Sequence, residues 1–154
     1  MSQDIQVRLA EVRDAETIAG FNVAMARETE QKELSPDVVR RGVQGLFETP
    51  KHGFYVVAES AGEVVGSLMV TYEWSDWRCG VFWWIQSVYV RPDFRRRGVF
   101  AGLYEFLRAR AAEKDGVCGL RLYFERANAA AQAAYRDVGM RKTSYGIFEE
   151  EFRR

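Results

Sequence analysis

The sequence predicts a single α/β (α+β) domain over residues 1–154, with about four helices and a mixed sheet of about six to seven strands. Three observations predict it. The chain has the length of one ordinary domain, and 47% of its 154 residues are hydrophobic. The apolar pattern has a period of two over residues 54–90. A strand, a helix and another strand follow one another over residues 81–124, which indicates a βαβ unit.

The N-terminal third predicts one strand and two helices. Apolar and polar residues alternate over residues 5–9, which is the pattern of a half-buried strand. Asp14 is a suitable cap for a helix that continues to about residue 30. Ser35 and Pro36 open a second helix, because proline fits the first helical position, and this helix ends before Pro50.

The middle third predicts an antiparallel meander. Three apolar stretches with a period of two, at residues 54–59, 64–74 and 81–90, are separated by short polar turns. Regular turn spacing of this kind is typical of strands that follow one another in a sheet. Pro92 ends the third stretch, because proline lacks the N–H that a central strand donates.

The C-terminal third predicts two helices and three strands. Residues 98–114 place apolar side chains near one helical face, and residues 117–124 follow as a strand. Asn128 caps a further helix that stops at Gly139. Two final strands are expected at residues 140–143 and 146–152.

Composition limits the classes of function. Lys and Arg total 22, as do Asp and Glu, so the zero net charge disfavours a strongly basic nucleic-acid binder. Two separated cysteines and one histidine form no paired motif, and we expect no metal. No apolar stretch is long enough to span a membrane. The first four residues lack the pattern of a secretory signal, so we expect a cytoplasmic protein.

The loop between the third meander strand and the next helix is the segment most indicative of chemistry. It contains Arg95, Arg96 and Arg97, and Gly98 opens the helix. Free backbone N–H groups at a helix N-terminus attract anions, and two linked phosphates suit such a site. Glycine also allows a ligand to approach the backbone closely. The spacing alone fits a solvated loop with a glycine turn equally well.

Residues 87–98, SVYVRPDFRRRG, resemble the GNAT superfamily of acyl-coenzyme A-dependent N-acyltransferases. The family pattern is a strand, a loop with proline, and then Arg or Gln followed three residues later by Gly at a helix start. Arg95 and Gly98 match this pattern. Phe100 departs from it, since the family usually has Gly or Ala there, although Ala101 and Gly102 follow at once.

A second stretch, residues 123–140, resembles the later motif of the same family. It has a strand, Asn128 at a helix start, Tyr135 within that helix, and then Gly139 followed by an apolar residue. The order of the expected elements also matches the family from residue 1 to residue 154. The resemblance therefore covers the whole chain.

The resemblance implies a site for acetyl-coenzyme A. In the family two strands splay apart, which leaves main-chain groups near Val88 free for the pantetheine arm; an ordinary central strand is the alternative. The arginine-rich loop and the helix start would hold the pyrophosphate through backbone amides. The residues expected to bind the cofactor are Val88, Tyr89, Val90, Arg95, Arg96, Arg97, Gly98, Val99, Phe100, Ala101 and Asn128.

Two of these motif residues have alternative interpretations. In the family the tyrosine that corresponds to Tyr135 is the general acid, which protonates the coenzyme A thiolate as it leaves. The alternative is a tyrosine packed under its helix. Asn128 contacts the pantetheine in the family and is also a plausible helix cap, and both roles are compatible.

The general base stays open at this point. Many family members place a Glu in the third meander strand, where this chain has residues 83–86, WWIQ. The candidates are Glu73, Glu28 and Glu30, each of which is otherwise an ordinary surface charge. A chain of water molecules is an equal alternative.

Aromatic and acidic residues predict the acceptor pocket. Trp74, Asp76 and Trp84, with Glu30, are expected to contact the substrate, because rings and carboxylates attract a cationic amine. The alternative for any one of these rings is packing on a face of the sheet.

The predicted function is N-acetyl transfer from acetyl-coenzyme A to a primary amine, by direct attack in a ternary complex. The alternative is a non-catalytic module that binds coenzyme A or another phosphate ligand. Tyr135 favours the enzyme, and the missing strand Glu favours the module. We expect a small-molecule amine as partner, no nucleic acid and no membrane, and we leave a homodimer open.

Overall fold

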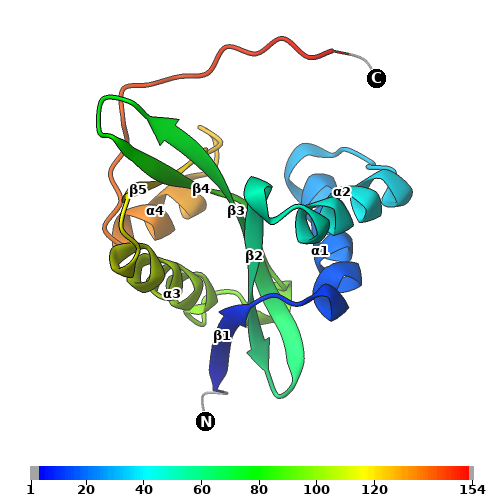
Figure 1. Cartoon of the computed structure of the whole chain (residues 1–154). Coiled ribbons are helices and arrows are strands. Elements are labelled where there is room, and N and C mark those ends of the chain that lie inside the picture. Colours follow the sequence, from blue (N-terminus) through cyan, green and yellow to red (C-terminus); the bar gives the residue numbers. More distant parts are fainter. Residues whose placement is uncertain (1–3, 153–154) are drawn as a thin grey trace.

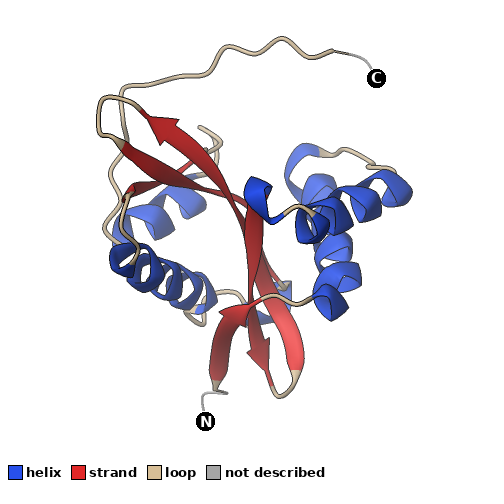
Figure 2. Cartoon of the chain, in the orientation of Figure 1, coloured by secondary structure: helices blue, strands red, loops and turns tan. Residues whose placement is uncertain are grey.

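The computed structural model describes residues 4–152. The expectation that the chain carries no secretory signal rests on its first four residues, and residues 1–3 lie outside the described part. Four α-helices and a sheet of five strands make up this part of the chain (Figures 1 and 2). The helices are α1 (Ala15–Glu30), α2 (Pro36–Glu48), α3 (Val99–Glu113) and α4 (Ala129–Asp137). The strands are β1 (Ile5–Leu9), β2 (Gly53–Ser60), β3 (Glu63–Ser75), β4 (Gly80–Val90) and β5 (Val117–Leu122). None of the helices between residues 4 and 152 has the length and apolar character of a membrane span.

The sheet has the strand order β1-β2-β3-β4-β5. The first four strands are antiparallel neighbours, and β5 pairs parallel with β4 after the crossover through α3, so the predicted meander and βαβ unit are confirmed. Helices α1 and α2 lie on one side of the sheet, and α3 and α4 lie on the other (Figure 1). Each side has its own apolar core, with Ile18 and Val57 in the α1–α2 core and Leu68 and Leu103 in the α3 core.

Helix caps explain two of the starts that the sequence predicts. The side chain of Ser35 accepts a hydrogen bond from the backbone N–H of Val38, and Asn128 accepts one from Ala131. Asp14 differs, since it precedes α1 without capping it. Its carboxylate instead accepts hydrogen bonds from Arg8 and from the backbone N–H of Glu11.

Burial acts to raise the pKa of Asp14, which is 4% exposed, but its hydrogen bonds reverse that effect. Arg8 and the N–H of Glu11 together hold this pKa below its usual value. Arg8 also binds Glu59 of β2. The buried carboxylate of Asp14 therefore fastens the start of α1 to β1, and through Arg8 to β2.

A bulge interrupts β4 near its C-terminal end. Ser67 of β3 pairs with Tyr89, whereas Met69 pairs with Gln86, so β4 has one residue more than β3 over this step. Ser87, within the bulge, has a φ of +52°, which is uncommon for a residue with a side chain. The extra residue reverses the alternation of β4, so Tyr89 lies on the α1 side of the sheet while Val88 and Val90 face the α3 core.

The two strands predicted at residues 140–143 and 146–152 do not form, so that prediction was wrong and the sheet has five strands rather than six to seven. Residues 140–152 are extended but pair with no strand among the described residues. Alternation breaks where Ile147 and Phe148 are adjacent, and three consecutive Glu follow. An extended segment needs a neighbouring strand for its hydrogen bonds, and local sequence does not supply one.

Candidate active site

The site begins where β4 and β5 diverge. Their parallel pairing runs from Val81 with Val117 to Ile85 with Leu122, and no described residue of β5 pairs with β4 beyond that point. The bulge at Ser87 lies just after this point and turns the end of β4. Residues 86–90 therefore have main-chain groups on one side that no described strand engages, which is the splayed arrangement that the resemblance implies.

The loop after β4 leads directly into the start of α3. Gly98 precedes the helix with a φ of +79°, in the left-handed region that favours glycine, and no side chain caps this end. A Cβ at Gly98 would meet no atom within 4 Å, so backbone conformation rather than crowding calls for glycine here. The first N–H groups of α3 have no acceptor within their own helix, and N–H groups in this position attract anions in general.

The three arginines of the loop differ in what they do. Arg95 donates to the main-chain oxygen of Val90 at 2.9 Å and to the carboxylate of Glu28 at 2.8 Å. The guanidinium of Arg97 lies over the ring of Phe94, with 5.2 Å to its centroid. Arg96 is exposed and has a φ of +64°. Arg95 thus holds the shape of the loop, while the side chain of Arg96 faces solvent.

Glu28 connects α1 to this loop. Its carboxylate accepts a hydrogen bond from the hydroxyl of Tyr89 at 3.0 Å as well as the one from Arg95. The hydrogen bond from Arg95, which outweighs a partial desolvation, lowers the pKa of Glu28. Burial first, and then the Glu28 carboxylate, raise the pKa of Tyr89. Glu28 is therefore an ionised and occupied carboxylate, which makes it a weak base in this state.

Tyr135 of α4 lies against α3. Its ring makes an edge-on contact with Phe100, with 5.6 Å between the ring centroids. Burial raises the pKa of Tyr135, which keeps its hydroxyl protonated at neutral pH. Phe100, the residue that departs from the family pattern, thus has a clear role in packing: it holds the tyrosine ring beside the start of α3.

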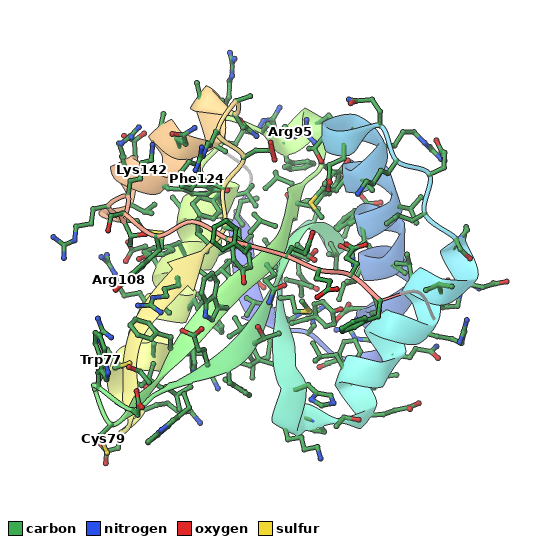
Figure 3. All side chains as sticks on the ribbon, turned by 90° about the horizontal axis from the view of Figure 1, so that it is seen from above. Trp77, Cys79, Arg95, Arg108, Phe124 and Lys142 are labelled. Atoms are coloured by element: carbon green, nitrogen blue, oxygen red, sulfur yellow. The ribbon has the colours of Figure 1, made fainter. Side chains whose placement is uncertain are left out.

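The other candidates occupy the far part of β3 and β4. Glu73 accepts a hydrogen bond from Arg121 of β5 at 2.7 Å, and the ring of Trp84 stacks on Tyr123 at 4.4 Å. Trp74 is 63% exposed, and Asp76 follows it in the turn. Trp77 and Cys79 mark the tip of this hairpin, at the opposite end of the molecule from Arg95 (Figure 3).

The predicted acceptor residues therefore do not form one cluster. Glu28 lies beside Arg95, Glu30 lies 3.6 Å from Lys32 at the same end of α1, and Trp74 and Asp76 lie on the hairpin. Glu73 pairs with Phe82 across the β3–β4 ladder, seven residues from Tyr89 along β4. At about 3.4 Å a residue this is about 24 Å, so a small amine cannot contact both Glu28 and Glu73.

Trp84 and Gln86 lie between these two carboxylates. Alternation along β4 places both on the α1 side of the sheet, opposite to Trp83 and Ile85 in the α3 core. Gln86 donates to the hydroxyl of Thr71 at 2.6 Å, which fixes its side chain. An acceptor that reaches the diverging strands from the α1 side would cross these two residues.

Sequence reasoning missed Ser87, Arg121 and Tyr123. The bulge at Ser87 depends on the pairing of β4 with β3, and no local sequence pattern predicts it. Arg121 and Tyr123 follow from register, since Trp84 and Arg121 are partners in the parallel ladder. Knowing that register, one would place Arg121 near Glu73 and Tyr123 near Trp84.

Comparisons with known proteins agree with this arrangement. No curated protein matches the chain. A possible acetyltransferase from Clostridium difficile 630 has 41% identity and a TM-score of 0.89, covering 97% of this chain and 99% of that one. A ribosomal-protein-alanine N-acetyltransferase from Brucella melitensis biovar Abortus 2308 shares the fold at 17% identity and a TM-score of 0.77, covering 97% and 99% of the two chains.

An aminoglycoside N-acetyltransferase in complex with coenzyme A also shares the fold, at 16% identity and a TM-score of 0.78, covering 98% of this chain and 97% of that one. The acetyltransferase (GNAT) family matches residues 12–140, a range that contains the diverging strands, the Gly98 loop and Tyr135. The chain therefore belongs to the GNAT acetyltransferase family and is an acyltransferase.

Proposed function

We propose that this chain transfers an acetyl group from acetyl-coenzyme A to a primary amine by direct attack in a ternary complex. One observation carries the proposal: the divergence of β4 from β5 and the uncapped start of α3 lie at the same end of β4. A ligand with amide groups and a pyrophosphate needs both features side by side.

The cofactor would run along the end of β4. In this proposal the main-chain groups of residues 88–90 pair with the pantetheine, and the backbone amides of residues 95–101 hold the pyrophosphate. Asn128 caps α4 and lies on the loop that leads from β5 to α4, which suits an additional contact with the pantetheine. Arg96, exposed beside the loop, supplies positive charge for the phosphates.

The chemistry would proceed in one complex. The amine nitrogen attacks the thioester carbon, the carbon–sulfur bond breaks, and the sulfur leaves with a proton from the hydroxyl of Tyr135. A main-chain N–H near Val88, beside the bulge, would hydrogen-bond the carbonyl oxygen as negative charge develops on it. The proton that the attacking amine loses passes to water or to a carboxylate.

We assign Glu28 to holding the amine rather than to accepting its proton, because its pKa is lowered and Arg95 and Tyr89 both bind it. A water molecule beside Gln86 would then accept the proton of the amine. Glu73 would meet only the distal part of a longer acceptor. A small cationic amine is the proposed acceptor, with Trp84 as an aromatic surface beneath it. We also propose the cytoplasm as its location, which the free and exposed Cys79 and Cys118 support.

Thiol release from acetyl-coenzyme A, measured over a broad panel of amines, tests the proposal. We expect release with at least one cationic amine, and the Glu28→Gln variant should raise the KM for that amine while leaving the KM for acetyl-coenzyme A unchanged. Glu73→Gln should raise it only for long acceptors. Glu33→Gln, which removes an exposed ion pair with Arg27, is the matched control. Binding of coenzyme A without thiol release from any amine would instead support the non-catalytic module.

A further inference from the structure

A cavity lies at the open edge of β2, where β1 ends and its chain leaves the sheet for α1 (Figure 1). The pairing of β1 with β2 stops at Leu9 with Val56, and the N–H of Ala10 donates to the main-chain oxygen of Tyr55 at 2.9 Å. The start of β2, at Gly53, therefore has no strand beside it on this edge among the described residues. The cavity has a volume of about 240 Å³.

Three aromatic rings form one wall of the cavity. Phe54 makes an edge-on contact with Trp83, with 5.2 Å between the ring centroids, and Tyr72 lies 6.3 Å from Phe54 and 6.5 Å from Trp83. Trp83 is buried and Tyr72 is exposed, so this wall runs from the core to the surface. Aromatic rings pack favourably with a further ring, edge-on or offset. The wall therefore suits a ligand that contains a ring.

The two charged residues that line the cavity are both cations. Arg110 lies in the last turn of α3, and Lys114 directly follows that helix. Four positions separate them, which places them on the same side of the helix end. Neither forms an ion pair with a residue that the structure describes, and no Asp or Glu is among the described residues of the cavity wall. Cations at a helix end commonly offset the helix dipole, but here they also give a cavity an unbalanced positive charge.

A second cavity, between the start of α1 and the turn from β2 to β3, lacks this imbalance. Three arginines line it, and each has a carboxylate partner within the chain: Asp14 for Arg8, Glu11 for Arg13 and Asp93 for Arg91. The positive charge of the second cavity is thus balanced inside the fold, whereas that of the first is available to a ligand.

A tyrosine hydroxyl also lacks a partner at the first cavity. Tyr55 lines the cavity from the α2 side, where its ring lies 5.5 Å from that of Phe47. Tyr55 is 5% exposed, and its hydroxyl makes no hydrogen bond to a described residue. Burial raises the pKa of Tyr55 to about 12, so the hydroxyl keeps its proton at neutral pH. Polar groups this far inside a fold are ordinarily hydrogen-bonded, and an oxygen of a ligand would supply the missing acceptor.

We propose that this cavity is a second ligand site, which binds a small aromatic carboxylate. The ring packs against Phe54, Tyr72 and Trp83, and the carboxylate binds Arg110 and Lys114. Hydrogen bonds between a cation and a carboxylate are stronger than those between neutral groups. The volume is about eight times the share of one water molecule in the liquid, which leaves room for one ring with a short acidic side chain.

The site is separate from the proposed cofactor loop. Arg110 and Lys114 lie at the C-terminal end of α3, and Gly98 precedes its N-terminal end. The helix has 15 residues, which at 1.5 Å each span about 22 Å. A ligand in this cavity therefore leaves the Gly98 loop free, and the inference does not depend on acyl transfer.

Calorimetry on the full chain tests the proposal, with phenylacetate as the probe and phenylacetamide as its uncharged match. The wild type should bind phenylacetate at least tenfold more tightly than the amide. The double variant Arg110→Gln with Lys114→Gln should lose this preference and keep the wild-type affinity for the amide, which would show that the cavity is intact. Arg108→Gln removes a cation of the same helix that Glu105 binds, and this matched control should keep the preference.

Two further measurements locate the ligand. Saturating coenzyme A should leave the affinity for phenylacetate unchanged, and proton–nitrogen NMR spectra should show shifted amide signals for Gly53 and Lys114 but not for Gly98. Equal or absent binding of acid and amide by the wild type would overturn the proposal, and so would a preference that survives in the double variant or displacement of phenylacetate by coenzyme A. None of these measurements uses turnover, so their outcome is distinct from that of the test of acetyl transfer.

Discussion

The loop between β4 and α3 and the surface on the opposite end of β4 are built in different ways. The first is made of backbone: a left-handed glycine, a bulge and a helix start, held in place by Val99 and Leu103, which are 2% and 0% exposed. The second is made of side chains from three strands, with Glu73 on Arg121 and Trp84 on Tyr123. A site made of backbone can accept the shared part of a ligand, whereas a site made of side chains can change with each acceptor. If the first region holds the cofactor and the second the acceptor, as proposed, cofactor binding should respond to changes in backbone conformation, and acceptor binding to changes in side chains.

Tyr135→Phe should have the largest effect, which is on turnover. It tests whether the region around the start of α3 also supplies a catalytic group. The substitution removes one hydroxyl and keeps the ring that packs on Phe100. If the hydroxyl is the general acid, kcat should fall by about 10²–10⁴. The affinity for coenzyme A, measured by calorimetry, should stay near that of the wild type. Full turnover in the Phe variant would assign Tyr135 to packing alone.

Gly98→Val should have the next largest effect, because it tests backbone conformation directly. Valine at a φ of +79° is strained although no neighbouring atom obstructs its Cβ, so the loop should move. We expect binding of acetyl-coenzyme A to weaken at least tenfold, or about 1.4 kcal/mol. Gly42→Val in α2, where a Cβ also has open space, is the control and should bind like the wild type. Unchanged affinity for the Gly98 variant in calorimetry would remove this loop from the site.

Glu28→Gln should have the smallest of the three effects, since on stability it tests one exposed ion pair, the one that joins α1 to the loop after β4. The pKa of Glu28 is lowered by Arg95, so the pair stabilises the fold above the carboxyl pKa of the unfolded chain. That contribution is lost as the pH falls through the folded pKa. Glu28 and Arg95 are 38% and 46% exposed, so we expect less than about 1 kcal/mol.

Urea unfolding of the wild type and of the Glu28→Gln variant, at neutral and at acid pH, measures this contribution. The difference between them should be present at neutral pH and vanish in acid. Glu30→Gln, two residues along the same helix, is the control, since its contact with Lys32 is 3.6 Å long and exposed. A difference that persists in acid would mean that Glu28 acts through packing and not through its charge.

Local signals predicted most of the fold. Ser35 with Pro36 and Asn128 mark helix starts by hydrogen bonds made within four residues, and the structure confirms both. The two C-terminal strands failed because a strand also needs a partner, and residues 140–152 find none among the described residues.

The candidate site likewise has one part that local sequence predicts and another that depends on contacts between distant residues. The loop at Gly98 can be predicted from the sequence, because a left-handed backbone conformation favours glycine and the glycine is visible in the sequence. The contact of Glu28 with Arg95 joins residues 67 positions apart, and the contact of Glu73 with Arg121 joins residues 48 apart. Contacts at such separations depend on register and on the bulge at Ser87, neither of which a single sequence reveals.

The divergence of β4 from β5 also has a consequence for the amount of folded protein. A ligand that fills this gap and binds only the folded chain adds RT ln(1 + [L]/Kd) to the free energy of unfolding, which is about 2.7 kcal/mol at a hundred times Kd. In a cell, the concentration of the acyl donor would then influence how much of the chain survives heat and proteolysis. The enzyme would persist where its donor is plentiful and be cleared where the donor is scarce, without any dedicated regulatory site.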